Sequence, residues 1–130
     1  MAKSSSRSQG QKITSLYRGE VYLVSFDPTV GHEIKKTRPA LVIQNDVGNR
    51  FSPLTIVAAI TSKISAVLYP VEVVVQPSKT NGLEATSAIR LDQIRTVDKQ
   101  RLIKRLGSVD PVVMRNVDEA VQISLGLVEI

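Results

Sequence analysis

Hydrophobic positions in this chain fall mostly into short runs rich in β-branched residues, separated by polar or turn-forming segments. The runs predict strands at 21–26, 40–44, 54–61, 71–75 and 88–94. Segments such as 45–53 and 76–82 carry Asn, Asp, Pro or Gly and predict turns. Several runs are apolar at successive positions, which indicates burial on both strand faces. A homodimer is one way to bury that excess.

Residues 98–106 show a different spacing. Leu102, Ile103 and Leu106 alternate with basic and amide side chains in a pattern typical of a short amphipathic helix. Gly107 follows directly and would end the helix.

The last segment carries the clearest helix signal. Asp110 is a good N-cap, and Pro111 suits the first helical position. Apolar residues then recur every four positions, at Val113, Val117, Val121 and Leu125. Short strands followed by one long helix exclude a repeated βαβ pattern and predict a mainly β fold, a small antiparallel barrel with a packed C-terminal α-helix.

Composition fits one domain, because the chain has 130 residues and is 42% hydrophobic. Residues 1–15 predict a basic, disordered N-terminal tail, and 16–130 the domain. The chain has no cysteine and no apolar run of about 18 residues, so we expect no disulfide framework, no membrane helix and a cytoplasmic location. The net charge is +5, but Lys3, Arg7 and Lys12 of the tail supply three of these charges. Charge alone is therefore weak evidence for a nucleic-acid partner.

The predicted loop 31–39 concentrates candidate chemistry. It holds the only histidine, His32, which is the one side chain with an ordinary pKa near neutrality. An incidental loop histidine is the alternative. Arg38 precedes Pro39 and so favours an extended backbone; its guanidinium suits bidentate phosphate contact, although it could equally be an ordinary exposed arginine.

A second candidate lies on the predicted strand 88–94. Alternation places Arg90 and Asp92 on the same outward face, where an acid and a cation could flank one phosphodiester. An exposed ion pair of little consequence is the alternative. Thr61 and Ser62 end another strand, where a hydroxyl could either satisfy the strand terminus or contact a phosphate. No metal-ligand motif, nucleophile elbow or phosphate-binding glycine loop occurs.

Several motifs, in order along residues 17–130, closely resemble the MazF/PemK/Kid family of type II toxins. They are Arg-Gly-Glu-Val-Tyr at 18–22, Asp-Pro-Thr-Val-Gly-His-Glu at 27–33, Thr-Arg-Pro-Ala-Leu-Val-Ile at 37–43, Asn-Arg-Phe at 49–51, Val-Ala-Ala-Ile-Thr at 57–61 and Asp-Gln-Ile-Arg-Thr-Val-Asp at 92–98. The resemblance implies an SH3-like barrel of the CcdB/Kid/MazF type and a homodimer. It also implies a metal-independent endoribonuclease, or mRNA interferase, that needs no cofactor, acts on single-stranded RNA and is neutralised by a cognate MazE/PemI-like antitoxin.

The family pattern implies two sets of catalytic residues, and this chain carries both. MazF-like members use residues matching Arg38 and Thr61, whereas Kid-like members use residues matching His32, Arg90 and Asp92. The RNA contacts implied are Glu33, Lys35, Lys36, Thr37, Arg50, Phe51, Ser52, Ser62 and Gln93. Two other functions remain open: a non-catalytic toxin of the same superfamily that poisons DNA gyrase, and an inert nucleic-acid-binding barrel.

Overall fold

The computed structural model describes residues 15–26, 31–32, 36–67 and 69–129. The predicted tail, apart from its last residue, lies outside this part of the chain. The described elements, in order, are β1 (Glu20–Ser25), β2 (Thr37–Val42), α1 (Asp46–Phe51), β3 (Leu54–Thr61), β4 (Glu72–Val75), β5 (Ser87–Asp98), the 3-10 turn η1 (Lys99–Arg101), β6 (Leu102–Ser108) and α2 (Pro111–Ser124).

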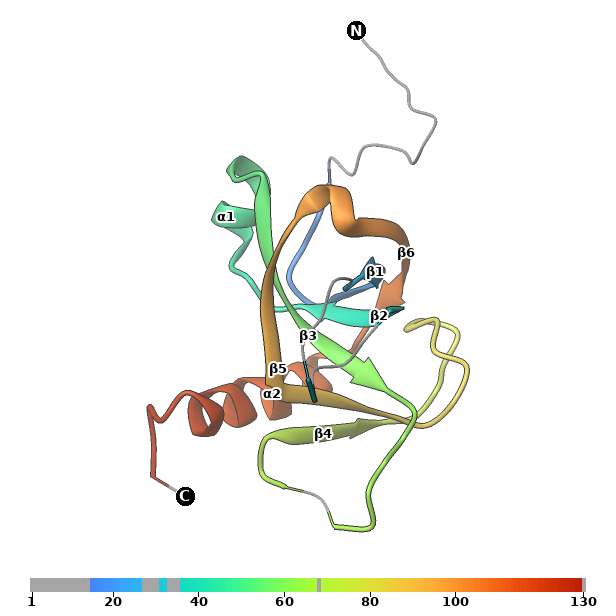
Figure 1. The fold of residues 1–130 in the computed structure, drawn as a ribbon, viewed down its shortest axis with the longest axis vertical. Coiled ribbons are helices and arrows are strands. Elements are labelled where there is room, and N and C mark those ends of the chain that lie inside the picture. The colour runs from blue at the N-terminus through green and yellow to red at the C-terminus, as the bar shows by residue number, and fades with distance from the viewer. Residues whose placement is uncertain (1–14, 27–30, 33–35, 68, 130) are drawn as a thin grey trace, which may run out of the picture.

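The strands form one coiled antiparallel sheet in the order β4-β5-β3-β2-β1-β6, with α2 packed across one face (Figure 1). The segment between β4 and β5 reaches the free edge of β6, where the Ser108 N–H donates to the Thr80 carbonyl at 2.8 Å. The predicted mainly β fold with a C-terminal helix is therefore confirmed.

Alternate residues of β3 enter two separate hydrophobic cores. Ala58 and Ile60 join the core that includes Val117 of α2, and Val57 and Ala59 join the second core, on the other side of the sheet. Strands that are apolar on both faces are thus buried on both faces within one chain. Their apolar excess is therefore buried within one chain, and it neither requires nor argues against the homodimer that the sequence pattern offered as one way to bury it.

The terminal helix begins as its sequence predicts. The Asp110 carboxylate accepts the Val113 N–H at 2.9 Å, Pro111 is the first helical residue, and Val117 is fully buried. This cap satisfies a backbone donor that would otherwise lack a partner in the first turn. None of the helices in the described residues is long and apolar enough to cross a membrane.

The predicted helix at 98–106 is wrong. Asp98 caps only the short turn η1, after which the chain continues as β6, an edge strand paired with β1. Two register shifts interrupt that pairing, so burial along β6 does not alternate regularly and its apolar spacing imitates a helix. The predicted turn segment 45–53 differs as well, since it contains α1, capped by the Asn45 side chain.

The buried side chain of Tyr22 makes the stability of the fold depend on pH in the alkaline range. Its side chain is 2% exposed, and its hydroxyl donates to the Ser15 carbonyl at 3.2 Å. Burial, with the negative charge of Glu20 adding to it, raises the pKa of Tyr22 to about 12. The unfolded chain releases this proton near pH 10, so the stabilisation is complete below pH 10 and is lost as the pH rises through 12.

We therefore expect the free energy of unfolding to fall by about 2–3 kcal/mol more between pH 9.5 and 12 in the wild type than in Tyr22→Phe. Urea denaturation of both proteins across this range measures the difference. The comparison cancels the other groups that titrate there, and parallel curves would show that Tyr22 is not the group responsible.

Candidate active site

A bulge in β5 shapes the candidate site. Along the pairing with β3, Ala58 lies opposite Ile94 but the next residue, Ala59, lies opposite Arg90. Residues 91–93 are therefore extra on β5, and the strand bends there. Leu91 points into the core and is fully buried, while Asp92 is exposed. Bulges often re-aim side chains at functional sites, and this one bears a predicted catalytic residue.

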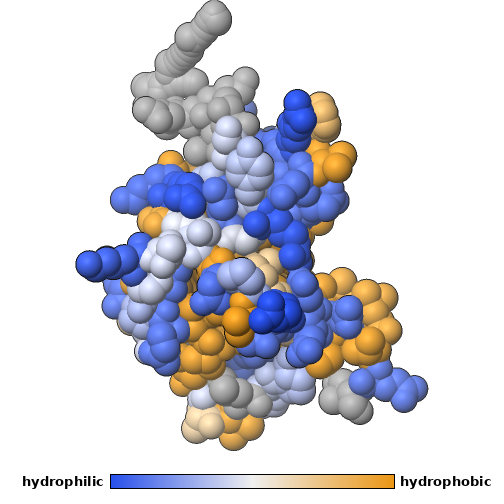
Figure 2. All heavy atoms as spheres, turned by 180° about the vertical axis from the view of Figure 1, so that it is seen from behind, coloured by the Kyte–Doolittle hydropathy of each residue, from blue (hydrophilic) through white to orange (hydrophobic). Residues whose placement is uncertain are grey.

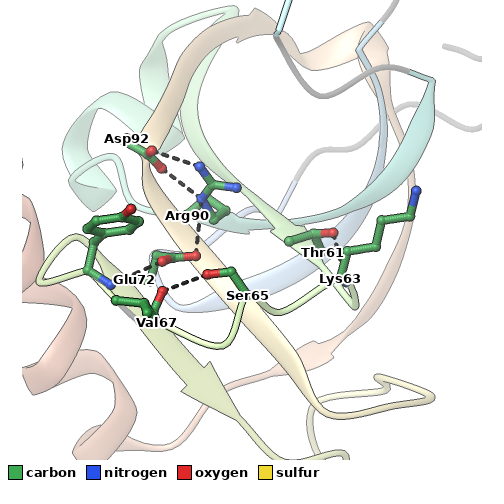
Figure 3. Close-up of polar contacts among 8 residues, drawn as sticks. Thr61, Lys63, Ser65, Val67, Glu72, Arg90 and Asp92 are labelled. Atoms are coloured by element: carbon green, nitrogen blue, oxygen red, sulfur yellow. Dashed lines mark hydrogen bonds and ion pairs between the residues drawn. The ribbon is translucent and has the colours of Figure 1, made fainter.

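Arg90 is held by two carboxylates (Figure 3). Its Nε and Nη2 donate to the two oxygens of Asp92 at 2.9 and 2.8 Å. The Glu72 carboxylate approaches Nε to 3.5 Å from the neighbouring strand β4, where Glu72 is the register partner of Arg90. The predicted shared face of Arg90 and Asp92 is confirmed, and in this structure the two form a bidentate ion pair.

Arg90, Asp92 and Glu72 differ in the chemical role that their charges and hydrogen bonds allow. The hydrogen bond to Asp92 raises the pKa of Arg90, so the guanidinium stays charged and can act as an electrostatic clamp but not as an acid. Each Asp92 oxygen keeps a second lone pair beyond its bond to Arg90, which leaves it able to accept a substrate proton. The side chain of Glu72 is only 5% exposed and also accepts the Tyr69 N–H, which makes it a fixed support.

Thr61 ends β3 and is buried. Its hydroxyl accepts the Lys63 N–H at 3.1 Å, which is the strand-terminus role that the sequence left open (Figure 3). The hydroxyl keeps its own hydrogen to donate. Ser62 and Lys63 are exposed beside it.

Strand pairing places three predicted catalytic residues at one end of the sheet. Ala40 of β2 pairs with Ala59 of β3, which in turn pairs with Arg90 of β5. Arg38 precedes Ala40 by two residues, and Thr61 follows Ala59 by two. Because these strands are antiparallel, Arg38, Thr61 and Arg90 share the same end of neighbouring strands.

The loop preceding β2 is only partly described. His32 is exposed. Lys36 has a positive φ of 70°. Its carbonyl accepts the Phe26 N–H at 3.1 Å, which joins the end of β1 to the start of β2. Thr37 begins β2 and is exposed. Glu33 and Lys35, both predicted RNA contacts, lie outside the described residues.

The structure separates the other predicted RNA contacts. Arg50 and Phe51 belong to α1 and Ser52 is its C-cap, just before β3 begins at Leu54. Thr61 is at the far end of β3, roughly 20 Å away at about 3.3 Å per residue. Gln93 follows Asp92 in the bulge of β5 and is half-buried.

Sequence reasoning missed Glu72 and Lys63. Glu72 lies in an apolar strand, and only the pairing of β4 with β5 reveals its contact with Arg90. Lys63 belongs to no motif that the sequence shows. Its place beside Thr61 comes from the turn after β3, where its N–H donates to the Thr61 hydroxyl. In the described parts of the chain, no three side chains of His, Cys, Asp or Glu are grouped so that they could hold a metal ion.

Solved structures with this fold define the class of protein. A MazF from Deinococcus radiodurans superposes with a TM-score of 0.73 at 26% identity, covering 86% of this chain and 97% of its own. An endoribonuclease from a mycobacterial species, solved in complex with its cognate antitoxin, gives a TM-score of 0.72 at 26% identity and covers 88% and 99%. The barrel is thus the fold of known MazF toxins.

Sequence comparison then gives the family. Residues 17–125 match the PemK-like, MazF-like toxins of type II toxin-antitoxin systems, and the chain belongs to this family. It is 51% identical over 112 residues to the endoribonuclease EndoA of Bacillus subtilis, covering 86% of this chain and 96% of that protein. It is 46% identical over 110 residues to the endoribonuclease MazF of Staphylococcus saprophyticus, covering 85% and 91%.

Proposed function

We propose that this chain is a sequence-specific, metal-independent endoribonuclease toxin that cleaves single-stranded RNA, including mRNA, in the cytoplasm and so inhibits translation and growth. The observation that carries the proposal is the ion-paired Arg90 and Asp92 at the same end of the sheet as Arg38 and Thr61. Membership of a family with endoribonuclease relatives supports the same reaction.

The reaction is an in-line displacement within the RNA. Asp92 accepts the proton of a ribose 2'-OH while the 2'-oxygen forms a bond to the adjacent phosphorus. The bond from phosphorus to the 5'-oxygen of the next nucleotide breaks, and His32 donates a proton to that oxygen. The products are a 2',3'-cyclic phosphate and a 5'-hydroxyl. DNA lacks the attacking hydroxyl and is spared.

Two arginines and one hydroxyl stabilise the transition state in this proposal. Negative charge accumulates on the phosphate oxygens as the new bond forms, and preorganised cations lower the free energy of that state. Arg90 serves in this role because two carboxylates fix its orientation and its pKa is raised. Arg38 supplies a second cation, and Thr61 donates a hydrogen bond that orients a phosphate oxygen.

The partners proposed are a second copy of the chain and a cognate MazE/PemI-like antitoxin. The mycobacterial endoribonuclease of similar fold has been solved with its own antitoxin. We expect the antitoxin to contribute an acidic segment that folds as it binds along the toxin dimer.

Incubation of the purified protein with a transcript and with single-stranded DNA of the same sequence, both in EDTA, tests the proposal. We expect cut RNA and intact DNA, and no cutting by a folded Arg38→Ala variant. Intact RNA with the wild type would reject the nuclease and favour the gyrase-poison alternative.

A further inference from the structure

The bulge in β5 leaves the backbone of Leu91 outside the regular strand pairing. On one side, the pairing with β3 skips residues 91–93; on the other, the pairing with β4 ends where Glu72 lies opposite Arg90. Leu91 is fully buried, so water does not satisfy its N–H and C=O groups. A buried backbone group without a partner costs about as much free energy as a lost hydrogen bond. Both groups of Leu91 therefore need partners from beyond the paired strands.

Two different parts of the chain supply these partners. The Leu91 N–H donates to the carbonyl of Val71, in the turn that leads into β4, at 2.8 Å. The Leu91 carbonyl accepts the hydroxyl of Ser124, the last residue of α2, at 2.6 Å. The first bond joins two backbone groups and exists whatever the side chain of Val71. The second bond depends on a side chain, so the amino acid at position 124 decides whether the Leu91 carbonyl is satisfied.

The end of α2 turns a polar side chain inward and apolar side chains outward. Ser124 is half-buried on the same helix face as Val117 and Ala120, which share a hydrophobic core with Leu91. The residues that follow it include three with exposed apolar side chains: Leu125, Leu127 and Val128. Apolar spheres gather at this end of α2, at the right of Figure 2. A helical serine commonly bonds to a carbonyl of its own helix, whereas the Ser124 hydroxyl crosses to β5.

This hydrogen bond acts directly on the backbone of Asp92. The Leu91 carbonyl belongs to the peptide unit that continues into Asp92, and a peptide unit is planar. Fixing the direction of the carbonyl therefore fixes the bond from which the Asp92 side chain departs. That side chain places its two oxygens 2.9 and 2.8 Å from the donors of Arg90. In a bulge no regular ladder holds the plane, so the Ser124 hydroxyl takes over that task.

We infer that Ser124 is a positioning residue for RNA cleavage. Its hydroxyl holds the peptide between Leu91 and Asp92, so that the Asp92 carboxylate keeps the orientation in which it accepts the 2'-OH proton. Ser124 touches no substrate and acts through the bulge alone. The inference rests on the proposed nuclease function and extends the catalytic machinery to the C-terminal helix.

Single-turnover cleavage of an RNA oligonucleotide that the wild type cuts tests this role. We expect Ser124→Ala to lower the rate about tenfold, because a displaced base reacts less well. Its affinity for the same oligonucleotide with a 2'-deoxynucleotide at the cut, which cannot react, should be unchanged. Ser124→Thr keeps a hydroxyl donor and should restore most of the rate.

The Asp92→Asn background separates positioning from a general structural effect. There, adding Ser124→Ala should slow the residual reaction by less than about twofold, because the base through which Ser124 acts is already absent. A purely structural role for Ser124 would slow the reaction by the same factor in both backgrounds.

Ser78→Ala is the matched control for the loss of one serine hydrogen bond. The Ser78 hydroxyl accepts the Asn81 N–H at 3.1 Å, in the segment after β4, at the end of that strand away from Glu72. Its loss should lower the free energy of unfolding, measured by urea denaturation, without slowing cleavage. If Ser124→Ala does not fold, Ser124→Cys takes its place, because a thiol is of similar size but is a weak donor.

The possible results distinguish the role of Ser124 from the nuclease function itself. If the wild type cleaves and folded Ser124→Ala cleaves at the same rate, the role of Ser124 is overturned and the nuclease stands. An equal further loss in the Asp92→Asn background overturns it too, as does a Ser124→Thr variant that is stable but as slow as Ser124→Ala. No cleavage by the wild type overturns the nuclease, and the inference with it.

Discussion

Asp92→Asn is expected to lower the single-turnover rate of RNA cleavage by about 10²- to 10⁴-fold, the usual contribution of a positioned general base. The substitution keeps the size of the side chain and its carbonyl oxygen, but it removes the group that accepts the 2'-OH proton. Binding of RNA should change little, because Arg90 keeps its charge. Rapid-quench kinetics at saturating protein measures the rate.

Glu72→Gln is the matched control for this prediction, since Glu72 is the other carboxylate on Arg90. If Asp92 only neutralised Arg90, the two variants would lose similar activity; as a base, Asp92 should matter far more. His32→Gln tests the acid separately and should also slow cleavage, because it removes the group that protonates the leaving 5'-oxygen. An unchanged rate in Asp92→Asn would reject Asp92 as the base.

Gly107→Ala should destabilise the fold by about 3 kcal/mol or more. Gly107 lies on β6, where the segment between β4 and β5 crosses it. A Cβ at this position would lie 2.1 Å from the Thr80 carbonyl oxygen, a backbone atom that cannot move without disturbing the contact between Thr80 and Ser108. Urea denaturation at neutral pH measures the loss.

Gly126→Ala provides the contrast. This glycine has φ +74° but no atom within 4 Å of an added Cβ, so only backbone strain of about 1 kcal/mol applies. Equal losses of unfolding free energy in the two variants would mean that the close contact between Gly107 and Thr80 does not stabilise this edge of the sheet.

Local signals were sufficient to predict most of the fold. Asp110 and Pro111 predicted the start of α2 because capping depends only on neighbouring backbone groups. The apolar runs predicted the strands because burial on both faces favours continuous β-branched sequences. The helix prediction for 98–106 was wrong because an edge strand with register shifts loses the regular alternation of buried and exposed residues. Its structure is decided instead by the tertiary pairing with β1.

The short helix α1 escaped prediction for a related reason. Asn45, Asp46 and Gly48 are typical turn residues, and here Asn45 instead caps a helix by accepting the Gly48 N–H at 2.8 Å. What makes the helix persist is the contact of Asn49 with Thr55, which no local pattern reveals.

The candidate site was predictable only in part. Alternation along one strand was enough to place Arg90 and Asp92 on a common face. Bringing Glu72 to Arg90 requires the pairing of β4 with β5, and placing Arg38 near Thr61 requires the pairing of β2 with β3. Strand partners distant in sequence are set by the whole sheet, so these neighbours emerge only from the structure.

Cleavage of a defined RNA oligonucleotide in EDTA, with analysis of the product ends by mass spectrometry, measures the proposed reaction most directly. The expected products are a 2',3'-cyclic phosphate and a 5'-hydroxyl, and a single 2'-deoxynucleotide on the 5' side of the cut should abolish cleavage there. Products ending in a 5'-phosphate, or undiminished cleavage beside the 2'-deoxynucleotide, would contradict attack by the 2'-OH and the roles given to Asp92 and Arg90.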